Sequence, residues 1–372
     1  MDQSQTSRST QSSSLERWLG AATSPAVSAL VLSFLICAVI ILLSGENPIR
    51  AYGELWSGAT TGAGPRTVIN RGIPIVAMAL AISIPFRSGI INLGGEGQFV
   101  LGGFAAAVVA INLDAPGPLV IFVSFLVAAI VGAVWGLLPA VGQTWLRLPI
   151  LISSLLLNTP ARALASYLTK NYFADPAATS TSTEALPAST RIPTISWLSG
   201  ASASALGVAV LVAAIYAFNR RTAPGYQSHI SGINLKFSEY GGVGVSRQTI
   251  LSMGSGGAIA GMAGAHMILG QSGRFVDYDL VGTGFAWTGL LVALLALHRA
   301  IPILAAGLFF AALQVGGLAM QRNTGVSWQL AQVLQAVVIL ALAMQIAPRL
   351  WRRRSSADVA SHDTDEYGSA TG

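Results

Sequence analysis

The stretch PLVIFVSFLVAAIVGAVWGLLP, residues 118–139, contains no charged side chain and a single hydroxyl group, that of Ser124. A helix of about 20 apolar residues is long enough to cross the hydrocarbon core of a bilayer. Runs of this kind recur along the chain, which is 53% hydrophobic and 10% charged and has a mean hydropathy of +0.62. Soluble domains carry about 25% charged residues. The composition therefore predicts a polytopic membrane protein.

The apolar runs also predict the fold class. Backbone groups cannot stay unpaired in lipid, so spanning segments are helices or closed barrels, and the alternating pattern of barrel strands is absent from these runs. We expect an all-α, polytopic membrane helical bundle with about ten transmembrane helices. The expected spans are residues 24–43, 68–85, 95–112, 118–139, 149–168, 201–218, 248–270, 282–298, 301–319 and 326–347.

The distribution of Lys and Arg predicts the orientation of these spans. Thirteen of these residues fall in segments on the side of the two termini and six on the opposite side, while Arg71 and Arg162 lie at span edges and are not counted. Cytoplasmic loops carry the excess of positive charge. We therefore expect a multi-pass protein of the cell membrane with both termini in the cytoplasm. Residues 1–23 and 348–372 are polar and predict disordered cytoplasmic tails around a transmembrane domain at 24–347.

Two connections are long, and two segments resemble each other. Residues 169–200 are rich in Pro, Ser and Thr and are expected outside the cell, whereas residues 219–247 are expected in the cytoplasm. Long connections inside compact proteins are commonly functional. The Gly-rich approaches GGEGQFVLGG (94–103) and VGTGFAWTG (281–289) each precede an apolar run. Paired Gly-interrupted segments of this kind are typical of transporter repeats, so we expect a two-half internal repeat.

The sequence favours transport over catalysis. Its four histidines are scattered, it has no H-E-x-x-H or Cys/His cluster for a metal, and it lacks G-x-S-x-G and the phosphate-binding G-x-x-x-x-G-K-[ST] loop. Its basic residues lie between apolar runs and do not form a patch with aromatic residues, which argues against nucleic-acid binding. We expect no enzyme activity, cofactor or metal site, and any ATP hydrolysis must take place on another chain.

The candidate substrate path consists of the polar and aromatic residues at membrane depth. Such residues are costly in lipid and usually face a cavity or a partner. The candidates are Asn92, Glu96, Gln98, Asn158, Phe285, Trp287 and Thr288. Two alternatives stay open for Glu96, because its carboxylate either lines the path or forms a structural hydrogen bond where the adjacent glycines break the helix.

Several motifs carry a family resemblance. They are RSGIINLGGEGQFVLGG (87–103), ISSLLLN (152–158), SGINLKFSEYGGVGVSRQTILSMGSGGAIAGMAGA (231–265) and GTGFAWTGLLVALLA (282–296). In this order they resemble the permease subunits of bacterial ABC importers for branched-chain amino acids, simple sugars and nucleosides. The Gly-x-Glu-Gly-Gln frame and the long external loop are most like the nucleoside-type members. The chain departs from the pattern at Ser228–Ser231, at Phe237–Glu239 and at Thr159-Pro160.

The resemblance implies a permease domain at 24–347 with the ABC importer permease fold and no ATPase of its own. It also implies a cytoplasmic ABC ATPase, a second and related permease chain, an external substrate-binding lipoprotein and contact with membrane lipid. Residues Gly232, Asn234, Glu239, Tyr240, Gly241 and Gly242 are expected to couple the cytoplasmic loop to the ATPase. The alternatives to a nucleoside importer are a monosaccharide importer of the same architecture, a secondary transporter and a membrane scaffold.

Overall fold

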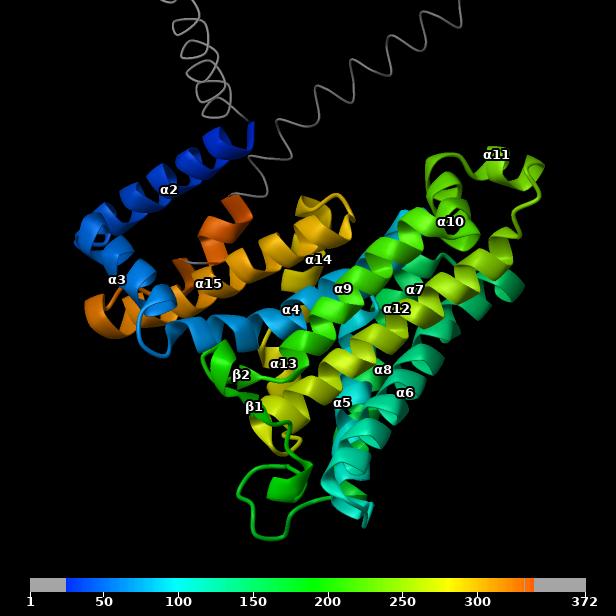
Figure 1. The fold of residues 1–372 in the computed structure, drawn as a ribbon, viewed down its shortest axis with the longest axis horizontal. Coiled ribbons are helices and arrows are strands. Elements are labelled where there is room, and N and C mark those ends of the chain that lie inside the picture. Colours follow the sequence, from blue (N-terminus) through cyan, green and yellow to red (C-terminus); the bar gives the residue numbers. More distant parts are fainter. Residues whose placement is uncertain (1–24, 331, 338–372) are drawn as a thin grey trace, which may run out of the picture. The chain divides into compact units, whose positions relative to one another are not determined.

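The computed structural model describes residues 25–330 and 332–337, and the fold of these residues is predominantly α-helical (Figure 1). The predicted tails at 1–23 and 348–372, and half of the predicted span at 326–347, lie outside the described residues. The chain divides into two compact units. One contains residues 59–315 and the other contains the described residues before 59 and after 315.

The smaller unit is built from helix α2 (Pro25–Leu43), most of helix α3 (Pro48–Thr60) and the end of helix α15 (Ala300–Thr324). The Tyr52 hydroxyl donates a 2.6 Å hydrogen bond to the carbonyl oxygen of Phe34, so α3 folds back on α2. Asn323 Nδ2 donates to Glu54 Oε2 at 2.6 Å and ties α15 to α3. Helix α3 was not among the predicted elements, because at 13 residues it is too short and too polar to register as a span.

The larger unit contains the helices that match most of the predicted spans. They are α4 (Gly64–Arg87), α5 (Gly95–Asn112), α6 (Gly117–Leu146), α9 (Ser204–Arg221), α12 (Val245–Met267) and α14 (Phe285–Leu295), together with the first part of α15. Four described helices, namely α4, α5, α6 and α15, are long and apolar enough to cross a membrane, or up to six spans if each of two bent helix pairs counts as one. This supports a multi-pass helical membrane protein, while the number ten and the internal repeat stay predictions.

The predicted span at 149–168 is not one helix. The chain forms α7 (Ile150–Leu156) and α8 (Asn158–Tyr172), which meet at Leu157. Pro160 explains the break, because its ring nitrogen cannot donate to the carbonyl of Leu156 and its ring would clash there in a continuous helix. The predicted helix at 248–270 also ends early, since α12 stops at Met267 and a π-helical turn, η3 (Ile268–Ser272), follows it.

The break expected next to Glu96 is absent, because α5 runs without interruption from Gly95 to Asn112. The small residues of this region serve packing instead. A Cβ atom at Gly261 of α12 would collide with the carbonyl oxygen of Ala128 in α6, and Gly102 of α5 approaches the backbone of Gly261 equally closely. Small residues let membrane helices approach at backbone distance. Helices α5, α6 and α12 therefore form the packed centre of the larger unit.

The two long connections lie at opposite ends of α12 (Figure 1). The connection after α8 contains η1 (Ala188–Thr190), η2 (Ser196–Leu198) and a two-stranded antiparallel sheet of β1 (Thr194–Ile195) and β2 (Ala201–Ser202). Its Leu186 N–H donates to the carbonyl of Gly273 at 2.8 Å, so this connection is fastened to the turn after α12. The connection after α9 contains α10 (Ala223–Ile233) and α11 (Leu235–Tyr240), and α13 (Asp279–Gly282) precedes α14.

Candidate functional site

The carboxylate of Glu96 is the centre of a polar cluster contributed by three helices. Arg162 of α8 places its Nη1 atom 3.1 Å from Glu96 Oε1, and Trp287 of α14 donates its indole N–H to Glu96 Oε2 at 3.0 Å. The second guanidinium nitrogen of Arg162 donates to Thr159 Oγ1 at 3.2 Å. We call Glu96, Arg162 and Trp287 the Glu96 cluster. Both carboxylate oxygens thus have a donor, which is the condition for burying a carboxylate.

The cluster lies at the surface of the larger unit. Glu96 is 8% exposed, whereas Trp287 is 46% exposed and the side chain of Arg162 is 30% exposed. The acid stands in the first turn of α5, where the helix dipole and the free N–H groups favour negative charge. The buried anion is therefore covered by two side chains that themselves reach the surface, so movement of either one would uncover it.

The N-terminus of α5 is held by amide side chains. Asn158 Oδ1 accepts the Gly97 N–H at 2.8 Å and Asn158 Nδ2 donates to the Leu93 carbonyl at 2.9 Å. A Cβ atom at Gly97 would lie 2.8 Å from that of Ala161, so the glycine allows α8 to approach this closely. Both polar atoms of the Asn158 amide therefore form hydrogen bonds to backbone groups near Glu96.

Asn92 and Gln98 complete this framework. Asn92 Oδ1 accepts the Gly94 N–H at 2.9 Å, and Asn92 Nδ2 donates to Gln98 Oε1 at 3.3 Å. Ser154 of α7 adds an acceptor for the Leu93 N–H at 3.1 Å. All of these side chains are buried. In this conformation their hydrogen bonds stabilise the start of α5. Of the predicted path residues, Trp287 is the one whose side chain lies at the surface, where it covers Glu96.

Phe285 and Thr288 are not part of the Glu96 cluster. Phe285 is 2% exposed, and the guanidinium carbon of Arg71 lies 5.8 Å from its ring centroid. Thr288 accepts a 3.4 Å hydrogen bond from Gln314 and is also buried. Their place in the substrate path stays a prediction, because both side chains pack inside the unit here.

The cavity next to the cluster is very small. Its volume is about 10 Å³, and its lining includes Ile82, Leu93, Glu96 and Trp287. A ligand pocket for a small molecule measures roughly 300–1,000 Å³. In this conformation the cavity is therefore too small to hold a substrate beside Glu96.

Arg162 is the functional candidate that sequence reasoning missed. It lies near the edge of a predicted span and was therefore not included among the path residues. Neither its positive charge nor its position in the sequence indicates which acid it pairs with. A usable signal was its spacing from Asn158, because residues four apart share one face of a helix. If Asn158 faces the start of α5, where Glu96 lies, Arg162 faces it as well.

The residues predicted to contact the ATPase gather on and around α11. Asn234 caps this helix by accepting the Phe237 N–H at 3.0 Å, and Gly242, with φ +77°, turns the chain after it. Tyr240 is 93% exposed and Phe237 is 63% exposed, and Glu239 and Gly241 are exposed beside them. A short, capped helix with two exposed aromatic side chains has the character of an interaction surface.

Helix α10 joins this surface to the residues before Glu96. The Ser228 and Ser88 hydroxyl oxygens are 2.8 Å apart, and Gln248 Nε2 donates to Ser88 Oγ at 3.3 Å. A Cβ atom at Gly232 would collide with the carbonyl oxygen of Arg87, so only glycine permits this approach. Residue 88 is the first residue after α4, and the segment that it opens leads directly to the Asn92 and Asn158 framework.

Known proteins resemble the chain over this whole region. Residues 65–343 match the family described as branched-chain amino acid transport system / permease component. The chain is 32% identical over 345 residues to a glucose ABC transporter permease protein of Haloferax volcanii, covering 87% of each chain. It is 29% identical over 330 residues to a guanosine ABC transporter permease protein of Bacillus subtilis, covering 86% of this chain and 93% of the relative. It is 28% identical over 351 residues to a nucleoside ABC transporter permease protein of Lactococcus lactis subsp. cremoris, covering 91% and 96%.

Proposed function

Because the chain belongs to the family of branched-chain amino acid transport system permeases, we propose that this ABC importer permease carries nucleosides across the cell membrane. The chain is a transport component, and the family implies association with an ATPase and a substrate-binding protein. Family membership also favours ATP-driven import over the alternatives of a secondary transporter and a scaffold.

The Glu96 cluster is the observation that carries the nucleoside proposal. A nucleoside is uncharged and offers hydroxyl groups, ring nitrogens and a flat aromatic base. The Glu96 carboxylate accepts hydrogen bonds from hydroxyl or N–H groups, the Arg162 guanidinium donates them, and the indole of Trp287 provides a face for stacking. Two relatives named for guanosine and for nucleosides align over nearly their whole length.

Transport requires the cluster to open. In the closed arrangement Arg162 and Trp287 occupy both oxygens of Glu96, so a nucleoside must replace their hydrogen bonds with its own. We assign the drive for this opening to an ATPase docked on α11, with Phe237 and Tyr240 as its principal contacts. Substrate is delivered by an external lipoprotein, and a second, related permease chain completes the path. The positive-inside distribution supports a cytoplasmic position for α11 and for both termini.

A hexose is the second candidate substrate, and one observation favours it. The glucose permease relative is 32% identical to this chain, slightly above the nucleoside permease relatives. Sugars use the same hydrogen-bonding groups and also pack against aromatic faces, so Glu96 and Trp287 serve either substrate.

Uptake competition separates the two substrates. The complete importer is expressed in a bacterial strain without its own nucleoside uptake, and entry of labelled guanosine is measured with excess adenosine, glucose or ribose. We expect adenosine to compete and the two sugars not to compete. Uptake should stop on ATP depletion and persist when an ionophore collapses the ion gradient. Uptake of labelled glucose with no entry of guanosine would replace the nucleoside proposal with the hexose one.

A further inference from the structure

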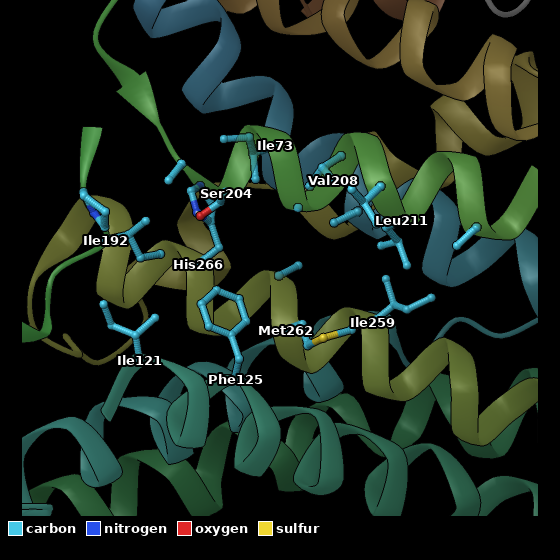
Figure 2. A pocket seen from close by; sticks show the side chains of 17 residues that line it. Ile73, Ile121, Phe125, Ile192, Ser204, Val208, Leu211, Ile259, Met262 and His266 are labelled. Atoms are coloured by element: carbon cyan, nitrogen blue, oxygen red, sulfur yellow. The ribbon is translucent and has the colours of Figure 1, made fainter. Parts of the chain in front are cut away.

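An apolar groove runs along the larger unit on another part of its surface from the Glu96 cluster. Figure 2 shows its wider part, with Ile73, Val208 and Leu211 on one side, Ile121 and Phe125 on the other, and Met262 and His266 between them. These residues belong to α4, α9, α6 and α12. The volume of this part is about 520 Å³. The 68% exposure of Val210 marks its open side.

The groove continues into a second cavity of about 380 Å³. Both cavities are lined by Ala214 and Ile259, so they lie end to end between α9 and the helices α4 and α12. Along α4 they extend from Ile73 to Arg87, which is about 21 Å at 1.5 Å per residue. This length exceeds half of the roughly 30 Å hydrocarbon core of a bilayer.

The lining of the wide part of the groove is almost entirely apolar. Its one ring with polar atoms, His266, has both nitrogens engaged, because Nδ1 lies 2.9 Å from Ser204 Oγ and Nε2 lies 3.2 Å from Gln271 Nε2. The Gln271 amide is oriented by its 3.0 Å hydrogen bond to the Asn70 carbonyl, so it donates to Nε2 and the His266 proton sits on Nδ1. The groove is therefore unsuited to a nucleoside or a sugar.

The opposite end is positively charged. Arg87 lines the second cavity together with Asn219, Ser228 and Gln248. In the part of the chain that the structure describes, Arg87 has no ion-pair partner, and its Nε atom is buried without a hydrogen bond. A guanidinium is well matched to a phosphate group, to which it can donate two parallel hydrogen bonds.

We propose that this groove binds an anionic phospholipid, with its phosphate at Arg87 and an acyl chain along Ala214, Ile259 and Met262. The bilayer supplies both parts of this occupant at the correct depth. A spanning helix, about 10 Å across and about 30 Å long, displaces on the order of 2,000 Å³, well above the volume of either cavity. The site is independent of the transported substrate, so it stands or falls separately from the nucleoside proposal.

Filling the groove tests the acyl-chain part. Gly207 lines the groove, and a Cβ atom there meets no heavy atom within 4 Å, so Gly207→Phe is chosen to place a ring in the groove. Ala213→Phe is the matched control, because Ala213 is exposed on the same helix and outside the groove. The complete importer is purified in mild detergent from bilayers of equal phosphatidylglycerol and phosphatidylcholine, and bound lipid is quantified by mass spectrometry. We expect the Gly207→Phe protein to lose the retained phosphatidylglycerol and the control to keep it. Equal retention in the two variants overturns the site.

Removing the charge tests the headgroup part. Arg87→Gln is compared with Arg221→Gln, which removes a charge at the end of α9 but does not line the groove. We expect Arg87→Gln to reduce the preference for phosphatidylglycerol over phosphatidylcholine about fivefold, the effect of one basic residue near an anionic surface. Wild-type protein without enrichment in phosphatidylglycerol would refute the proposal.

A photoreactive residue at Val210 identifies the occupant directly. In place of valine, a benzoylphenylalanine on the open side of the groove is irradiated in intact membranes of cells that express the importer. An adduct with phospholipid supports the proposal, whereas an adduct with another protein chain assigns the groove to a subunit contact and overturns it.

Discussion

Arg162 and Glu96 lie 66 positions apart in the chain, and their side chains meet at 3.1 Å across helices α8 and α5. This ion pair, with Trp287 on the other carboxylate oxygen, closes the surface over the only acid in the first turn of α5. The pair therefore serves two roles in the proposed cycle. It stabilises the closed arrangement, and it must separate for a substrate to be held by Glu96.

Arg162→Ala is expected to destabilise the protein and to abolish uptake. Removing the arginine leaves a nearly buried carboxylate with the indole as its remaining side-chain donor. We expect this to lower the free energy of unfolding by about 1–3 kcal/mol. The cost is less than for a fully buried pair, because the Arg162 side chain is 30% exposed. Thermal unfolding and guanosine uptake measure the two effects. Arg274→Ala is the control, because its 3.8 Å pair with Asp175 is more exposed and should cost less than about 1 kcal/mol. Equal losses of stability and uptake in the two variants would show that the ion pair of Arg162 with Glu96 contributes no more than an exposed pair.

Asn158→Ala is expected to act through folding. It leaves the Gly97 N–H and the Leu93 carbonyl without their side-chain partner at a buried position, which costs about 2–4 kcal/mol. Asn171→Ala on the same helix removes an exposed hydrogen bond to the Tyr167 carbonyl and should change stability by less than about 0.5 kcal/mol. A stable Asn158→Ala protein that nevertheless fails to transport would instead assign Asn158 to the substrate.

Two substitutions of Trp287 are expected to distinguish stacking of the substrate on its ring from hydrogen bonding through its N–H. Trp287→Phe keeps an aromatic face and loses the N–H that reaches Glu96, while Trp287→Leu loses both. If the base stacks on the indole, Trp287→Leu should raise the KM for guanosine by about 2- to 12-fold relative to Trp287→Phe, the equivalent of roughly 0.5–1.5 kcal/mol. Uptake kinetics in the two variants provide the measurement. Identical KM values would exclude stacking on this residue.

Tyr240→Ala is expected to uncouple the permease from its ATPase without unfolding it. The side chain is 93% exposed, so its removal has little effect on stability, whereas an aromatic anchor in an interface contributes about 2 kcal/mol or more. Co-purification of the ATPase and ATP-dependent uptake should both fall. Tyr172→Ala, at a 67% exposed tyrosine that ends α8, provides the comparison and should retain both.

His298 should make stability sensitive to mild acid. It lies between α14 and α15, its ring stacks on Phe86 at 4.7 Å, and burial lowers its pKa from 6.5. The folded protein therefore disfavours the protonated ring, so its contribution is complete above pH 6.5 and declines as the pH falls below that value. The difference in unfolding free energy between wild type and His298→Phe should change with pH in this range. A difference that stays constant with pH would contradict the assignment.

The parts of the fold that follow from apolar length were predictable. Four of the predicted runs coincide with helices α4, α5, α6 and α15, and the range 24–43 matches α2 within a residue. The division of the predicted span 149–168 at Leu157 did not follow from hydropathy. Its cause is Pro160, a single residue inside an otherwise apolar run.

The candidate site was predictable in composition and less so in geometry. The structure brings Glu96 and Trp287 into contact, and the role of the predicted residues in transport stays a prediction. Hydropathy does not show which amide side chains bind the backbone, as those of Asn92 and Asn158 do. Arg162 was missed because a residue at a span edge reads as an orientation signal, although its spacing from Asn158 placed it on the same face. Pairing across distant helices depends on tertiary packing, which one sequence does not specify.

The contact of Gly232 with the Arg87 carbonyl has a mechanical consequence. The segment that follows Arg87 reaches Glu96 within nine residues, and Asn92 and Asn158 pin its far end. This segment is short and is held at both ends, so in the proposed cycle a displacement of α10 is passed on to the start of α5. In the proposed cycle the same connection also acts in the opposite direction, so a substrate that separates Arg162 from Glu96 would shift α10 and the proposed ATPase-binding surface on α11.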